Sequence, residues 1–182
     1  SNICGKESDT FLTTPDPFEM HQMLSNLYEW GGEYCVIEAS SQGIAESRLY
    51  GLDFHICVLT NFSRDHLDYH RTMENYLSAK KQIFKSCSKA IINIDDENKE
   101  EFIRETKGKV ITYSLNNNEA DYIAKSIKQN ENGSDYAVVA DYQIHRIKLN
   151  MPGEFNIMNS LAAIAAAREC DVSLEFCAYA LK

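Results

Sequence analysis

Short apolar runs alternate with amphipathic stretches over the first two thirds of the chain. Four runs have the length and residue types of buried strands: 34–37, 55–60, 89–93 and 109–113. Between and before them, helical spacing covers 17–30, about 45–50, 72–87 and 97–106. Strands that alternate with helices predict an α/β domain built on a mostly parallel, doubly wound sheet flanked by helices.

Two of these helices have recognisable start signals. Asp16 precedes Pro17 and is followed three residues later by Glu19, a pattern typical of a capped helix start. Thr72 can cap the helix that runs to about Cys87. The stretch 62–71 between the second strand and this helix is polar and charged, so we expect a loop there.

The pattern changes after Asn116. The segments 122–128, 136–141 and 143–151 alternate polar and apolar residues, and Asn132-Gly133 is a turn signal between the first two. This predicts a small antiparallel β unit at about 120–151. Two last helices are expected at 156–168, with Asn156 as its N-cap, and at 173–182.

Composition restricts the function classes. The 182 residues are 44% hydrophobic and 25% charged, as in ordinary globular domains, and carry a net charge of −9. An acidic surface disfavours nucleic-acid binding, and no apolar run is long enough to span a membrane. The six cysteines contain no CxxC pair, so we expect buried thiols in a cytoplasmic protein: Cys4, Cys35, Cys57, Cys87, Cys170 and Cys177.

Polar residues follow the first two predicted strands, where open α/β sheets bind their ligands. Glu38 ends the first strand, and a polar group follows the second: Asn61, Ser63, Asp65, His66, Asp68 and His70. A carboxylate beside a His-rich loop can hold Mg²⁺, which needs few protein ligands. Alternatively, Glu38 caps a helix or pairs with Arg48, and the loop is a solvated turn.

Lys80 is unusual among the lysines because of its place on the predicted helix. On a helical wheel with 100° per residue and Tyr76 at 0°, Lys80 lies at about 40°, and the apolar residues around it average about 36°. An amine that faces inward should have a lowered pKa, and a neutral amine can add carbon dioxide to give a carbamate, an oxygen ligand. Alternatively, Lys80 extends to the surface or pairs with an aspartate.

Polar residues near two other helix starts could also bind ligands. Thr13 and Thr14 precede a helix start and could donate to an anion, or serve only as caps. Asn156 and Asn159 lie one turn apart on a late helix. The sequence has no GxxxxGK[ST] phosphate loop, so the chain alone is a poor candidate for an ATPase.

The order of these motifs resembles the Mur ligases, in particular those that add the third residue of the peptidoglycan stem. The matching runs are TTPDP, EASSQGIAESRLYGLDF, TNFSRDHLDYHRTMENYLSAKKQIF, NIDDE and PGEFNIMNSLAAIAAA. The resemblance implies ATP-dependent amide formation through an acyl phosphate, with UDP-MurNAc-L-Ala-D-Glu and an amino acid as substrates. It further implies that residues 1–182 are the central ATP-binding domain of a longer cytoplasmic enzyme, without its phosphate loop and C-terminal domain, and inactive alone.

The resemblance also assigns roles to individual residues. Glu38, His66 and Lys80 match the magnesium-binding positions, with Lys80 carbamylated and His66 and Lys80 important for catalysis. Asn61 and Asp65 would orient these ligands. Substrate contacts are implied for Thr13, Thr14, Ser40 and Arg48, and contacts to the adenine and ribose of ATP for Asn156 and Asn159.

Two positions depart from the family pattern. Gln42 stands where many relatives have His, and Glu46 stands where a substrate-binding Gln is common. A carboxylate cannot donate a hydrogen bond as an amide can, which puts a substrate contact by Glu46 in doubt. Other Mur-type ligases of the stem peptide and a non-catalytic α/β binding module remain alternative interpretations, and the sequence gives no oligomeric state.

Overall fold

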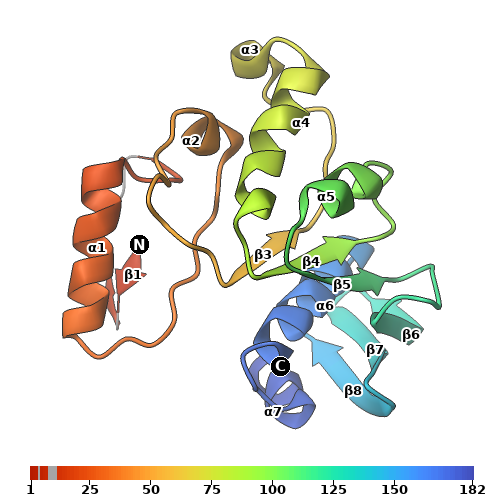
Figure 1. The fold of residues 1–182 in the computed structure, drawn as a ribbon. Coiled ribbons are helices and arrows are strands. Elements are labelled where there is room, and N and C mark those ends of the chain that lie inside the picture. The colour runs from red at the N-terminus through yellow and green to blue at the C-terminus, as the bar shows by residue number, and fades with distance from the viewer. Residues whose placement is uncertain (4, 8–11) are drawn as a thin grey trace. The chain divides into compact units, whose positions relative to one another are not determined.

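The computed structural model describes residues 1–3, 5–7 and 12–182, so Cys4 lies outside the described residues (Figure 1). The chain divides into two compact units, which are described separately. The smaller unit contains Ser1–Asp53 and Arg64–Ile83, and the larger contains Phe54–Ser63 and Phe84–Lys182.

The larger unit is built on a six-stranded sheet with the order β3-β4-β5-β6-β7-β8. Its strands are β3 Ile56–Leu59, β4 Lys89–Asn93, β5 Lys109–Ser114, β6 Tyr122–Asn130, β7 Gly133–Ala140 and β8 Gln143–Leu149. Neighbours from β3 to β6 are parallel, and β6–β7 and β7–β8 are antiparallel. The predicted α/β class is confirmed. The predicted antiparallel unit extends the same sheet, and its first turn lies one residue earlier than expected, at 131–132.

Helices cover both faces of this sheet. α6, Glu154–Arg168, contacts strands β3 to β7 and buries Ile157, Leu161 and Ile164 in the main core. α5, Lys99–Glu105, lies on the opposite face in Figure 1 and contributes the fully buried Phe102. The last helix is α7, Leu174–Ala180, which contacts β8. The sheet therefore has apolar cover on each side.

The start of α6 differs from the prediction. Gly153, with a φ of 103°, is the N-cap, and Asn156 lies inside the first turn, so the predicted Asn156 cap is wrong. The Asn156 side chain instead donates to the Pro152 carbonyl at 2.7 Å. Glycine takes this φ without strain, which explains why the chain turns into the helix there.

The smaller unit is mostly helical. Its elements are the antiparallel pair β1 Asn2–Ile3 and β2 Lys6–Glu7, and the helices α1 Pro17–Glu29, α2 Ser41–Ala45, α3 Leu67–His70 and α4 Met73–Lys81. A 3₁₀ turn, η1 Gln82–Lys85, follows α4. The side chains of Asp16 and Thr72 accept from the Glu19 and Asn75 amides, so both predicted caps are confirmed.

Three local predictions are wrong in this region. Residues 34–37 form no strand, and Val36 is 99% exposed. A strand needs a hydrogen-bonded neighbour, and none of the described residues pairs with this run. The helix expected at 45–50 lies at 41–45, where Ser40 caps it, and the loop expected at 62–71 contains the single turn α3.

The thiols are mostly inside, as expected. Cys57, Cys87 and Cys177 are buried and Cys170 is half-buried, whereas Cys35 is exposed, contrary to the prediction. Cys35 belongs to the run 34–37, which does not enter a sheet, and this explains its exposure. Among the helices of the described residues, none combines the length and apolar character that a membrane span requires.

Candidate functional site

The segment that carries Glu38 and Ser40 is fixed by Thr14. Thr14 is fully buried, and its hydroxyl lies 2.8 Å from the Glu38 carbonyl and 2.9 Å from both the amide and the hydroxyl of Ser40. The Ser40 hydroxyl in turn accepts from the Gly43 amide at 3.1 Å. A Cβ at Gly43 would lie 2.7 Å from the Thr14 Cβ, so the close packing here requires glycine.

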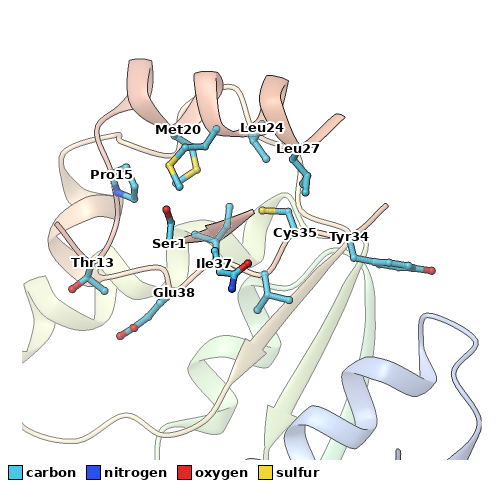
Figure 2. Close-up of a pocket in the computed structure, with 13 residues that line it drawn as sticks. Ser1, Thr13, Pro15, Met20, Leu24, Leu27, Tyr34, Cys35, Ile37 and Glu38 are labelled. Atoms are coloured by element: carbon cyan, nitrogen blue, oxygen red, sulfur yellow. The ribbon is translucent and has the colours of Figure 1, made fainter. Parts of the chain in front are cut away.

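Glu38 lies at one end of a cavity of about 240 Å³ in the smaller unit. Figure 2 shows Met20, Leu24 and Leu27 entering this cavity from α1, while the Glu38 carboxylate points away from them. The cavity is therefore lined by apolar side chains of α1 together with the polar residues Ser1, Asn2 and Thr13, and Glu38 is exposed.

His66 sits at a strained corner of the chain. Its φ of 53° and ψ of 28° are left-handed, and its amide donates to the Asp65 carboxylate at 2.7 Å. The other Asp65 oxygen lies 3.5 Å from His66 Nε2, so Asp65 contacts both the backbone and the ring of His66. Non-glycine residues in this conformation cluster at functional sites.

Lys80 lies on the inner side of α4, as its helical position predicted. Its Nζ donates to the Ala39 carbonyl at 3.5 Å. Burial lowers the pKa of the Lys80 amine, and the charge of Glu38 opposes this shift. One turn earlier, the Tyr76 and His66 rings form a T-shaped pair with centroids 5.8 Å apart. Lys80 is therefore near Glu38, and its helix also contacts His66.

Glu38 and His66 carry groups that can bind a metal, and Lys80 could gain an oxygen ligand of the kind that magnesium prefers. A carboxylate and an imidazole are metal ligands, and a buried amine with a lowered pKa can react with carbon dioxide. Within the described part of the chain, no three His, Cys, Asp or Glu side chains lie together as a metal-binding group.

Arg48 pairs with Glu46 rather than with Glu38. Its Nε and Nη2 donate to one Glu46 oxygen at 2.9 and 2.5 Å, and its Nη1 donates to the Thr14 carbonyl at 3.0 Å. The Tyr69 hydroxyl donates to the other Glu46 oxygen at 3.1 Å. Hydrogen bonds from Arg48 and Tyr69 lower the pKa of Glu46. The departure at position 46 thus supplies a partner for the arginine.

A second group of polar residues lies at the carboxyl ends of β3 and β4 in the larger unit. Asn93 donates to the Thr60 carbonyl at 2.8 Å, and the buried Asp96 accepts from the Phe62 amide at 2.5 Å. These bonds hold the turn that contains the exposed Asn61. Asn93 and Asp96 belong to the run NIDDE, to which the sequence assigned no site role. Asn93 ends the strand and Asp96 follows three residues later, and this position at a strand end was the available signal.

The two asparagines of α6 share one side of its first turns. Asn156 is half-buried and Asn159 is exposed. Three residues separate them, a spacing that aligns side chains along a helix. Both belong to the larger unit, whereas Glu38, His66, Lys80, Ser40 and Arg48 all belong to the smaller one.

Comparison with known proteins decides the family. The family model described as "Mur ligase middle domain" matches residues 2–167. The chain belongs to the Mur ligase middle-domain family. Membership of this family accounts for the sheet, its antiparallel extension and the order of the motifs in this Mur ligase domain.

Among the relatives of this Mur ligase domain is the UDP-N-acetylmuramoyl-L-alanyl-D-glutamate–2,6-diaminopimelate ligase of Clostridium perfringens. The two are 38% identical over 95% of this chain and 36% of the relative. The ligase of the same name from Caldanaerobacter subterraneus is 40% identical over 87% of this chain and 33% of the relative. The chain therefore spans about a third of the length of the curated relatives it matches.

Solved structures of Mur ligases share the fold of this domain. A structure of a UDP-N-acetylmuramoyl-L-alanyl-D-glutamate–2,6-diaminopimelate ligase superposes with a TM-score of 0.86, at 32% identity over 92% of this chain and 36% of that one. The MurF ligase from Thermotoga maritima in complex with ADP has a TM-score of 0.63 at 18% identity, over 93% of this chain and 41% of that chain. The second likeness supports the fold alone.

Proposed function

We propose that this Mur ligase domain is the ATP-binding domain of a ligase that adds the third residue to UDP-MurNAc-L-Ala-D-Glu. The observation that carries the proposal is the placement of Lys80 near Glu38, on a helix that also contacts His66. In the proposed reaction the substrate carboxylate attacks the γ-phosphate of ATP and gives an acyl phosphate and ADP. The amine of the incoming amino acid then displaces phosphate and forms the amide.

Glu38, His66 and Lys80 are the proposed magnesium ligands. The Lys80 amine, whose pKa is lowered by burial, would add carbon dioxide and release a proton, leaving a carbamate on Nζ. Bound magnesium would supply charge stabilisation for the transferring phosphoryl group. Asp65, through its bonds to the amide and ring of His66, would orient that imidazole.

Thr13, Thr14, Ser40 and Arg48 are the proposed contacts to the UDP-linked substrate. Thr13 is exposed, and the Ser40 and Arg48 side chains are anchored by the bonds around Thr14. Because Thr14 is fully buried, its most direct contribution is to hold the segment from Glu38 to Ser40. A contact from Thr14 itself to the substrate stays a prediction.

Asn156 and Asn159 are the proposed contacts to the adenine and ribose of ATP. The sequence of this domain contains no glycine-rich phosphate loop. We therefore propose that residues outside 1–182 hold the triphosphate in the complete enzyme, and that the isolated chain does not turn over ATP.

The proposal is tested in the full-length protein with Lys80→Ala and the neighbouring Lys81→Ala as a matched control. Phosphate release that requires both UDP-MurNAc-L-Ala-D-Glu and an amino acid is the assay, with 2,6-diaminopimelate and lysine compared as the amino acid. We expect Lys80→Ala to lose most activity and to regain part of it with a short carboxylic acid, which can replace the carbamate. Lys81→Ala should retain activity.

A ¹³C-NMR carbamate signal from ¹³C-bicarbonate gives a readout without turnover. It should be present in the wild-type protein and absent in Lys80→Ala. Full activity in Lys80→Ala would exclude the role of the lysine. Absence of amino-acid-dependent phosphate release from the wild-type protein would exclude the ligase reaction itself.

A further inference from the structure

His70 differs from the other histidines of the chain in its burial. It is 6% exposed, whereas His21, His55 and His66 are exposed and His145 is half-buried. It lies at the end of the single turn α3, in a stretch whose sequence predicts a solvated loop. Because burying an imidazole is costly unless its nitrogens find partners, a buried histidine in such a stretch calls for a specific contact.

That contact is Ser41. His70 Nε2 lies 2.9 Å from the Ser41 hydroxyl, which is itself only 1% exposed. The ring is held between Tyr69 and Tyr76, with centroid distances of 4.8 and 5.3 Å. The Asn75 side chain donates to the His70 carbonyl at 3.0 Å. The His70 imidazole and its backbone are therefore contacted from Ser41, Tyr69, Tyr76 and Asn75.

The His70–Ser41 bond joins two parts of the proposed site that are 29 residues apart in sequence. On one side, the His70 amide donates to the His66 carbonyl at 2.9 Å, so the two residues form one rigid turn. On the other side, Ser41 follows Ser40 and begins α2. The bond therefore ties the turn that carries His66, one proposed metal ligand, to the segment that carries another, Glu38.

We propose that His70 is a positioning residue that, through Ser41, holds the His66 imidazole in place relative to Glu38. The inference rests on the proposed cation site and deepens it. It predicts that the hydrogen-bonding nitrogen of His70, and not merely the volume of its ring, sets the cation affinity of the site. A role confined to filling space would be met equally well by phenylalanine.

The test uses the full-length protein with Mn²⁺ as an EPR-visible probe of the magnesium site, and it requires no turnover. His70→Phe fills the space without a hydrogen bond, and His70→Gln places an amide nitrogen near the position of Nε2. Ser41→Ala removes only the partner. We expect His70→Phe and Ser41→Ala to weaken Mn²⁺ binding about 10-fold, and His70→Gln to recover most of that loss.

Each outcome decides the proposal. Wild-type Mn²⁺ affinity in His70→Phe, or equal losses in His70→Phe and His70→Gln, would overturn it. If His70→Phe does not fold, Ser41→Ala carries the same test, and unchanged binding in that variant overturns the proposal. His66→Asn separates the two levels: if it loses Mn²⁺ while His70→Phe does not, only the positioning role is wrong. If it binds Mn²⁺ normally, the proposed cation site is wrong and the positioning role with it.

Discussion

The Glu46 carboxylate accepts two hydrogen bonds from Arg48, at 2.9 Å from Nε and 2.5 Å from Nη2. The arginine is thus neutralised by a neighbour two residues away before any substrate arrives. An anionic substrate that contacts Arg48 has to share the guanidinium with Glu46, or replace Glu46 as its partner.

Replacing Glu46 by Gln should therefore tighten substrate binding. The amide removes the competing negative charge but can still accept from Arg48, so we expect the KM for UDP-MurNAc-L-Ala-D-Glu to fall about two- to fivefold with little change in kcat. Steady-state kinetics of the full-length protein measures this. Tyr69→Phe, which removes only the bond to the other Glu46 oxygen, is the control and should leave KM unchanged. An unchanged or higher KM in Glu46→Gln would contradict the competition.

Thr14→Val should destabilise the protein without changing the shape of the side chain. It leaves the Ser40 amide and the Glu38 carbonyl without their buried hydroxyl partner, at a cost of about 1–3 kcal/mol. Urea unfolding gives the difference in the free energy of unfolding. Thr14→Ser keeps the hydroxyl and should retain more of the stability than Thr14→Val. Equal stability of Thr14→Val and wild type would show that the hydroxyl network is dispensable.

Asp96→Ala should release the turn at Asn61. The carboxylate accepts from the amides of Phe62 and Asn98, and its loss leaves both donors without that partner. We expect about 2–3 kcal/mol of destabilisation and faster hydrogen exchange at the Phe62 amide. The exposed neighbour Glu97 provides the control, because Glu97→Ala should change neither quantity. Unaltered exchange at Phe62 would mean that the carboxylate does not hold the turn.

Glu169 should make stability depend on pH. Burial acts to raise its pKa, but hydrogen bonds and charges from Lys89 and Lys109 outweigh burial and lower it below 4.5. A carboxyl whose pKa is lower in the folded state contributes stability above its unfolded pKa and loses it as the pH falls through the folded value. At neutral pH the free energy of unfolding of wild type should exceed that of Glu169→Gln by about 1 kcal/mol. The difference is small because the ion pairs are partly exposed.

The difference in the free energy of unfolding between wild type and Glu169→Gln should shrink as the pH falls below 4.5. Urea unfolding across the acid range measures it. Glu175 is exposed on α7, so Glu175→Gln should be as stable as wild type at every pH tested. A constant difference between Glu169→Gln and wild type at all pH values would contradict the assignment.

Local chemistry allowed much of the fold to be predicted. The caps at Asp16 and Thr72 were predictable because the capping side chain and the amides it satisfies lie within one turn. The strand predicted at 34–37 was wrong because apolar composition cannot reveal whether a neighbouring strand exists. The lowered pKa of Lys80 followed from helical periodicity alone.

The support of the site could not be predicted in this way. The Asp96 carboxylate reaches an amide 34 residues earlier, and His70 reaches Ser41 across 29 residues. Such contacts depend on how the elements pack, which no local pattern encodes. The sequence identified His70 as one of several polar residues after a strand but could not indicate that it turns inward.

Two requirements restrict the residue at position 66: it has to tolerate a left-handed backbone, and it has to supply a ligand atom for the proposed cation site. Glycine adopts this region without strain, and asparagine, aspartate and histidine are enriched there among other residues; of these only aspartate and histidine offer a strong ligand atom for a cation. Alanine would change the chemistry and leave the unfavourable dihedral angles in place. Asparagine is thus the substitution that separates the two constraints, since it suits the corner while lacking the imidazole.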